Sequence, residues 1–129
     1  MAGQFDVHNV VVTLPIGGSV VTPVFKNPTD NGKISIIEAY IIPGGAGTMT
    51  ATLVTVATGG CTTASAVVDA TLGTFGSAAN VSADGSAATC TIATPEVDEN
   101  HWVAVSSAAG TLGANSRCYI SYVKGIAGD

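Results

Sequence analysis

Residues 33–57, KISIIEAYII-PGGAG-TMTATLVTVA, decide the fold. The first ten are rich in isoleucine and form the most strand-like segment of the chain. Pro43 and the glycines after it break that segment, and threonines then alternate with apolar residues over residues 48–57. Such alternation is typical of an antiparallel sheet with one buried and one solvated face. We therefore predict two antiparallel strands, at residues 33–42 and 48–57.

The same period of two recurs on both sides of this stretch. It predicts six further strands, at residues 5–13, 19–25, 66–72, 87–93, 101–106 and 117–124. Pro23 lies inside one of them and indicates an edge strand or a bulge there. No ten-residue window carries a convincing helical stripe, so the crossovers that parallel strands need are missing. We predict an all-β fold, a single antiparallel β-sandwich or jelly-roll-like domain of about seven or eight strands.

The length of 129 residues fits one domain, and we assign residues 7–129 to it. A core face follows from the alternation, although the register of each strand stays open. Its expected members are Val10, Val12, Ile34, Ile36, Tyr40, Met49, Leu53, Trp102, Ala104, Ile120 and Tyr122.

Charge is sparse, and its balance excludes several classes of partner. Charged residues make up 10% of the chain, against about 25% in an average soluble domain. A net charge of −5 with four basic residues argues against nucleic acid and against an anionic membrane surface. No apolar run approaches the roughly 20 residues of a membrane-spanning helix. The first residues lack the basic and apolar regions of a secretory signal, which favours a cytoplasmic site of synthesis.

Three cysteines, Cys61, Cys90 and Cys118, are odd in number and widely spaced. They form no C-x-x-C pair, and the two histidines do not complete a zinc spacing. We predict buried, reduced and inert thiols. A Cys61–Cys90 bridge stays open as an alternative.

The inventory of catalytic groups is thin. Glu38 stands inside an apolar strand, where burial would raise its pKa, but a strand carboxylate more commonly faces solvent or pairs with Lys33 or Arg117. His101 could form a site with Asp98 and Glu99, or be a satisfied histidine at the start of a strand. We predict a protein that is not an enzyme, with no catalytic residue, no cofactor and no metal ligand.

The whole-chain pattern resembles the small β-sandwich decoration (cement) and head-associated structural proteins of tailed bacteriophages. The resemblance covers most of the chain outside residues 58–86. It rests on the order and residue composition of the strands, without an invariant motif. The passages that carry it are VVV at residues 10–12, VVTPVF at residues 20–25, GKISIIEAY at residues 32–40, the threonine-alternating strand at residues 48–56, HWVAV at residues 101–105 and CYISYVKG at residues 118–125.

The resemblance implies a virion protein made in the host cytoplasm and added to the outer capsid surface. It implies the major capsid protein as a partner, a homotrimer at local threefold positions, and a role in holding neighbouring capsomers together. We expect residues 1–6 to be either an N-terminal arm that orders on docking or an ordinary frayed terminus. The candidate contact residues are Met1, Ala2, Gly3, Gln4, Phe5 and Asp6.

Three other functions compete with this interpretation. A tail, fibre or host-recognition module of a phage would use the same fold class. Two or three aromatic side chains lined up on one face would favour a carbohydrate-binding module. A pocket that held both Glu38 and His101 would favour a hydrolase.

Overall fold

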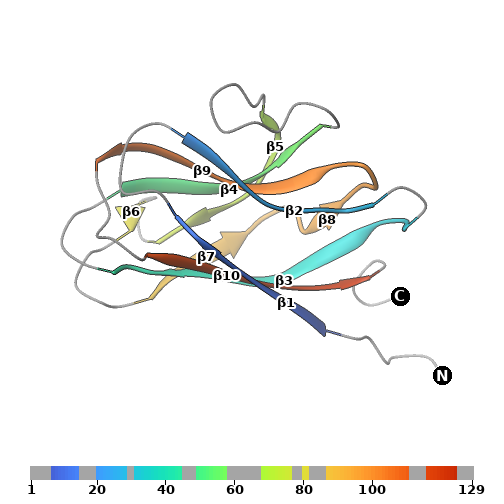
Figure 1. Cartoon of the computed structure of the whole chain (residues 1–129), viewed down its shortest axis with the longest axis horizontal. Helices are drawn as coiled ribbons and strands as arrows, with labels where there is room; N and C mark the ends of the chain where they lie inside the picture. Colours follow the sequence, from blue (N-terminus) through green and yellow to red (C-terminus); the bar gives the residue numbers. More distant parts are fainter. Residues whose placement is uncertain are drawn as a thin grey trace.

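The structure is a computed structural model that describes residues 7–14, 20–28, 31–44, 49–57, 68–76, 80–81, 87–110 and 116–124. The regular structure among these residues is all strand, with no helix, so the all-β prediction is confirmed (Figure 1). The strands are β1 (Val7–Thr13), β2 (Val20–Lys26), β3 (Ile34–Ile42), β4 (Met49–Val56), β5 (Val68–Phe75), β6 (Asn80–Val81), β7 (Ala88–Ile92), β8 (Glu96–Val97), β9 (Trp102–Gly110) and β10 (Arg117–Lys124).

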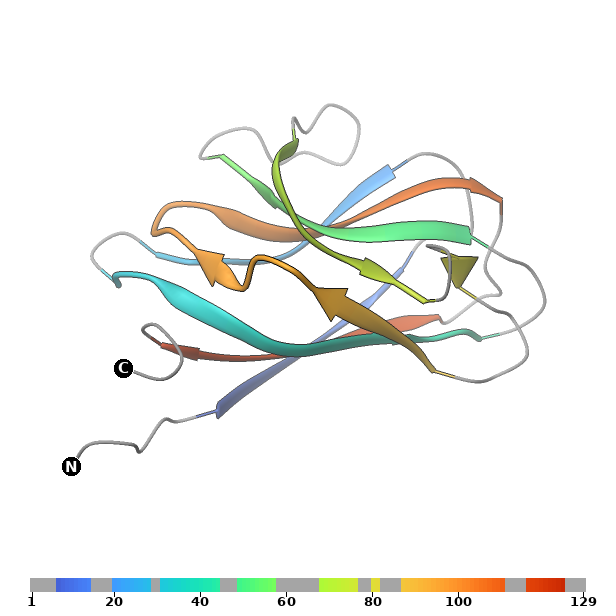
Figure 2. The same ribbon diagram turned by 180° about the vertical axis from the view of Figure 1, so that it is seen from behind.

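All of the strand pairings are antiparallel, and they join the strands into one sheet of order β1-β10-β3-β7-β5-β4-β9-β2. The short strands β6 and β8 pair with β4 and β3. Because β7 pairs with β3 on one side and β5 on the other, the sheet curls into a nearly closed, barrel-like shape. Figures 1 and 2 show β1, β10 and β3 as one wall and β2, β9 and β4 as the wall that faces it.

The pairing of the eight longer strands is nested. The first pairs with the last (β1–β10), the second with the second last (β2–β9), the third with the sixth (β3–β7), and the fourth with the fifth (β4–β5). Segments from the two ends of the chain therefore lie side by side.

The core lies between the two walls and is made mostly of aliphatic side chains. Its largest fully buried members include Phe75, Ile34, Ile41, Leu53, Leu72 and Ile120. The eight predicted strands are all present, with shifts of one to three residues at most ends. Two differences are larger: β9 runs to Gly110, past the predicted end at residue 106, and the two-residue strands β6 and β8 were not predicted.

A bulge in β3 changes which residues face the core. Tyr122 pairs with Ile36 and Ser121 with Glu38, so Ile37 has no partner of its own on β10. Before the bulge Ile36 is buried, and after it Ala39 and Ile41 are buried. The prediction that Tyr40 lies in the core is therefore wrong, because an extra residue turns every later side chain to the other face.

A second apolar cluster lies on the other face of the β4–β9 pair. Val54, Val56 and Ala104 are buried there, with Val21 and Trp102 packed against them. Trp102 and Ala104 were predicted for the main core, but their neighbours Val103 and Val105 occupy it instead. For β9, the alternation was predicted correctly, but the face that enters the main core was assigned incorrectly.

Candidate functional site

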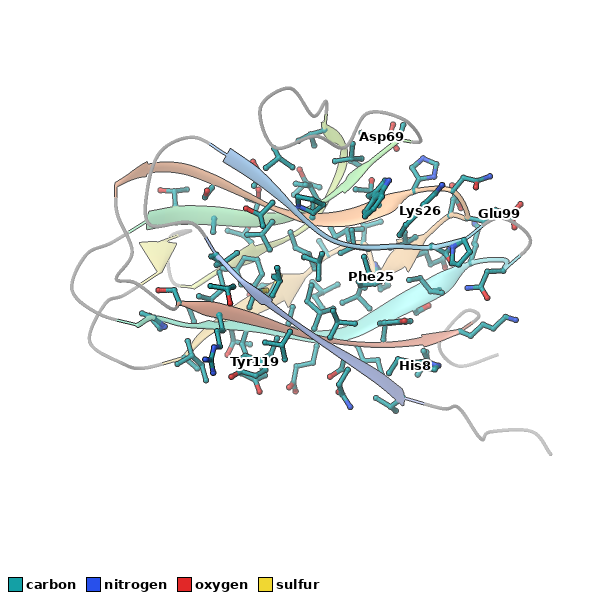
Figure 3. The ribbon with its side chains drawn as sticks, in the orientation of Figure 1. His8, Phe25, Lys26, Asp69, Glu99 and Tyr119 are labelled. Atoms are coloured by element: carbon teal, nitrogen blue, oxygen red, sulfur yellow. The ribbon has the colours of Figure 1, made fainter. Side chains whose placement is uncertain are left out.

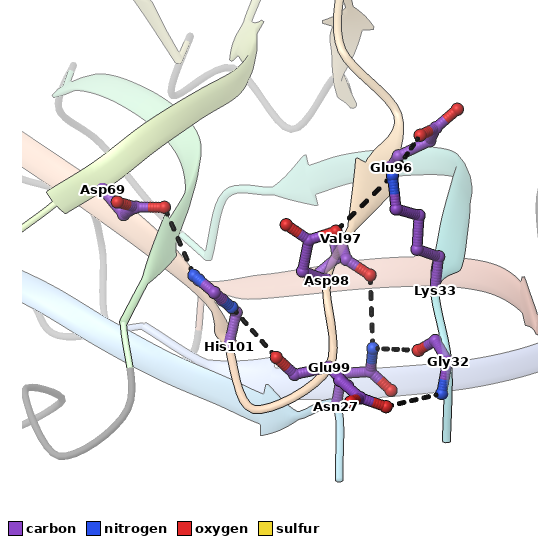
Figure 4. Close-up of polar contacts among 9 residues, drawn as sticks. All are labelled: Asn27, Gly32, Lys33, Asp69, Glu96, Val97, Asp98, Glu99 and His101. Carbon is purple, nitrogen blue, oxygen red and sulfur yellow. Dashed lines mark hydrogen bonds and ion pairs between the residues drawn. The ribbon is translucent and has the colours of Figure 1, made fainter. Parts of the chain in front are cut away.

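A cluster of hydrogen bonds joins the chain after β2 to the turn before β9, and its centre is Asn27 (Figure 4). The Asn27 side chain is 1% exposed, and its Nδ2 donates to the carbonyl oxygens of Gly32 at 2.8 Å and Val97 at 3.2 Å. Its Oδ1 accepts from Asn31 Nδ2 at 2.7 Å. In the backbone, the Asn27 N–H donates a hydrogen bond to His101 O, and Asn27 O accepts one from the Asn100 N–H. One buried amide therefore fixes two loops that lie 70 residues apart.

Charged groups surround this centre on its solvent side. Lys33 Nζ lies 3.3 Å from Glu96 Oε1 and 3.7 Å from Asp98 Oδ1. The hydrogen bond and the charge of Glu96, followed by the charge of Asp98, raise the pKa of Lys33 above its ordinary value. All three side chains are well exposed, so these ion pairs add little to stability.

His101 contacts a carboxylate that the sequence did not single out. Its Nε2 lies 3.4 Å from Asp69 Oδ2, an ion pair only when the ring is protonated, and its Nδ1 lies 3.1 Å from Glu99 O. Asp98 and Glu99, the expected partners, face Lys33 and the backbone N–H of Gly32 instead. The contact with Asp69 depends on the pairing of β5 with β4, and no local sequence motif predicts that pairing.

The two residues of the hydrolase alternative lie in different walls. Glu38 is exposed in the middle of β3, opposite Ser121 of β10. His101 lies just before β9, in the opposite wall. Within the described ranges no three His, Cys, Asp or Glu side chains are grouped so that they could hold a metal ion. The hydrogen bonds around Asn27 join loops, and no nucleophile stands within that group.

The outer face of the β1–β10–β3 wall carries an apolar and aromatic row. Val11 pairs with Tyr119, which pairs with Tyr40. The two tyrosine rings stack with centroids 5.0 Å apart and planes 13° apart. Figure 3 places Tyr119 on this wall, on the side away from the core. Val11 is 52% exposed, and Ile37 and Ile42 on β3 are 48% and 39% exposed.

Charge and polarity on this face are confined to the margins of the row. Ser121 Oγ donates to Asn9 Oδ1 at 2.6 Å on one side, where Glu38 also lies. Arg117 lies on the other side, opposite Thr13 and Ile42. The face is therefore mostly uncharged and aromatic at its centre, which are properties of a contact surface for another macromolecule.

The described cysteines are free and buried, as the sequence predicted. Burial raises the pKa of the Cys90 thiol to about 11. Burial, followed by the charge of Cys90, raises the pKa of the Cys118 thiol to about 12. Both remain protonated and unreactive at neutral pH. Because Cys90 is free, the alternative of a Cys61–Cys90 bridge is wrong. Cys61 and the proposed contact residues Met1, Ala2, Gly3, Gln4, Phe5 and Asp6 lie outside the described residues.

Comparisons with family models, with curated proteins and with solved structures found no match to this chain. In the described part of the chain, no helix has the length and apolar character needed to cross a membrane.

Proposed function

We propose that this chain is a jelly-roll protein of a virion, a non-enzymatic capsid decoration (cement) protein that binds the outer capsid surface and stabilises contacts between capsomers. The observation that carries the proposal is the nested pairing of the eight longer strands. A long antiparallel ribbon that is rolled around a core pairs its strands in this way. Such a rolled ribbon is characteristic of the jelly roll, a fold that recurs in viral capsid proteins.

The fold alone does not determine the function, so the surface must support it as well. The outer face of the β1–β10–β3 wall offers Val11, Tyr119 and Tyr40 in one row with little charge around them. Such a face suits a contact with another protein, where aromatic side chains supply much of the binding energy.

The mechanism is mechanical. Each copy bridges neighbouring capsomers through modest interfaces, and many copies add their binding energies over the shell. The partners in this proposal are the major capsid protein and other copies of this chain, with trimers as the form that the resemblance implies. No bond is made or broken in the process.

The test is the copy number of the chain in purified virions, measured by quantitative mass spectrometry against the major capsid protein. A ratio near one to one supports decoration of the whole shell. A few copies per particle would contradict decoration and favour a tail, collar or fibre role. Absence from the particle would overturn a virion role altogether.

One observation favours a second candidate, a carbohydrate-binding module. Tyr40 and Tyr119 are two aromatic side chains on one outer face, and sugar rings commonly pack on such rings. Jelly rolls also serve as lectin domains. Calorimetric titration with oligosaccharides would support this candidate if binding were lost in Tyr40→Ala and kept in Val68→Ala, a substitution on β5.

A further inference from the structure

The two end strands of the sheet differ in how their free edges are protected. Pairing of β2 with a further strand is obstructed by Pro23, which has no N–H, by the register shift between Pro23 and Phe25, and by the charge of Lys26. These are the usual devices that prevent edge-to-edge association. Strand β1 has the sequence VHNVVVT. It contains no proline and no glycine, and it carries no charge when His8 is neutral.

The free edge of β1 also lacks a paired strand in the described part of the chain. Within the described residues β1 pairs with β10 alone, over all seven of its positions. Val7 and Val11 are 54% and 52% exposed, and Val10 and Val12 are only partly buried. An uncharged edge of this length, without proline or bulge, is a template for one more strand.

The chemistry of the edge favours a second copy of the chain as that strand. The whole chain carries a net charge of −5, so a different protein would bind it most selectively through a complementary positive charge. The β1 edge offers no charge for such selection, and two copies can therefore meet there without like charges in opposition.

The order of residues in β1 also suits pairing with itself. In an antiparallel pair centred on Val11, Val11 stands opposite its own symmetry mate, Val10 opposite Val12, and Asn9 opposite Thr13. Over these five positions, residues 9–13, each apolar residue meets an apolar residue and each polar residue meets a polar one, whereas Val7 and His8 lie beyond the paired segment. The row of Tyr40, Tyr119 and Val11 then continues into the same row of the second copy.

We propose that two copies of this chain associate through antiparallel pairing of their β1 edges about a twofold axis at Val11. A contact of this kind uses the same patch on both copies and so joins them in pairs. It does not depend on the virion role, and it differs from the trimer that the resemblance implies.

The first experiment is sedimentation velocity of the full chain over a wide concentration range, with circular dichroism to verify folding. The wild type is expected to form a dimer as concentration rises, and Val11→Lys is expected to stay monomeric. Val68→Lys, at an exposed valine on β5, is the matched control and is expected to dimerise like the wild type. A monomer at every concentration, a trimer, or a dimer that Val11→Lys leaves intact would overturn the proposal.

The second experiment tests the register through a disulfide. Directly opposed residues have Cβ atoms about 4.5–5.5 Å apart, close enough for two cysteines to bridge after a small adjustment. In a Cys61→Ser background, Val11→Cys is expected to give a covalent dimer under mild oxidation, whereas Val68→Cys is not. Absence of the Val11→Cys dimer would overturn pairing at this register. A monomeric wild type whose capsid binding is lost in Val11→Lys would assign the edge to the capsid protein and overturn self-pairing.

Discussion

The rings of Phe25 and Tyr122 stack with centroids 4.5 Å apart, although their strands lie in opposite walls and are not paired with each other. His8 of β1 stacks on the same tyrosine at 5.1 Å. Figure 3 shows Phe25 between the walls and His8 on the neighbouring strand. Aromatic side chains thus hold β2 against the β1–β10 pair, although no backbone pairing joins β1 to β2 in the described residues.

Loss of this contact should loosen the barrel. Phe25→Ala is expected to lower the free energy of unfolding by about 2–3 kcal/mol, below the full range for a buried phenylalanine because Phe25 is only partly buried. Urea unfolding followed by circular dichroism measures the change. Val68→Ala removes an exposed valine and should shift stability by less than about 0.5 kcal/mol. A Phe25→Ala loss as small as that of the control would show that the stack does not hold the walls together.

The strands were predictable because their signal is local. Alternation and Gly/Pro/Asn turns located all eight longer strands, including β3 and β4, where the signal was clearest. The face of each strand was harder to predict. The extra residue at Ile37 reverses the alternation in the middle of β3, and a bulge depends on the partner strand rather than on its own sequence.

The candidate site was predictable only in part for a similar reason. The gap between the predicted strands at residues 19–25 and 33–42 implies a connection around Asn27, but nothing in it indicates that the Asn27 amide reaches Val97 across the molecule. The contact of His101 with Asp69 likewise requires β5 to lie near the start of β9, on the far side of β4. Long-range neighbours follow from the nested pairing, which the sequence of any single strand does not contain.

Asn27 should be among the polar residues most important for stability. Asn27→Ala leaves the carbonyl oxygens of Gly32 and Val97 without their donor, and we expect a loss of about 2–4 kcal/mol because each unsatisfied buried group costs about 1–3 kcal/mol. Asn27→Asp should be at least as harmful, since a carboxylate cannot donate to either carbonyl. Chemical denaturation measures both variants.

The neighbouring Asn31 provides the control for this prediction. Asn31→Ala removes a single bond to Asn27 Oδ1 at a partly exposed position, and it should cost about 0.5–1.5 kcal/mol. Equal losses for Asn27→Ala and Asn31→Ala would contradict the central role of Asn27.

Gly73 in β5 has no room for a side chain. A Cβ at this position would lie 2.4 Å from Thr91 O and 2.7 Å from Cys90 Sγ on the neighbouring strand β7. Gly73→Ala is therefore expected to destabilise the fold by about 1–3 kcal/mol, because strand separation must increase locally. Thermal unfolding measures the change.

The double variant Gly73→Ala/Cys90→Ala separates the two clashes. Removal of the sulfur should recover only part of the stability lost in Gly73→Ala, because the Thr91 carbonyl belongs to the backbone and remains in place. Full recovery would show that the sulfur alone excludes a side chain at position 73.

The buried thiols predict a loss of stability in alkali. Folding raises the pKa of Cys90 to about 11 and that of Cys118 to about 12, from an ordinary value of 9.0. Below pH 9 both thiols are protonated in the folded and unfolded chain, and their contribution to stability is fully present. As pH rises above 9 the unfolded chain releases protons that the folded chain retains, so the free energy of unfolding falls up to about pH 12.

Tyrosine and lysine also titrate in this range, so the test compares slopes. Stability is measured by urea unfolding from pH 8 to 10.5 in the wild type and in Cys118→Ala, under reducing conditions. Cys118→Ala is expected to be less stable at pH 8, because it leaves a small cavity, yet to lose less stability as the pH rises. Parallel slopes would mean that the Cys118 thiolate is solvated in the folded protein, and the wall of β1, β10 and β3 would then be more open than its buried residues indicate.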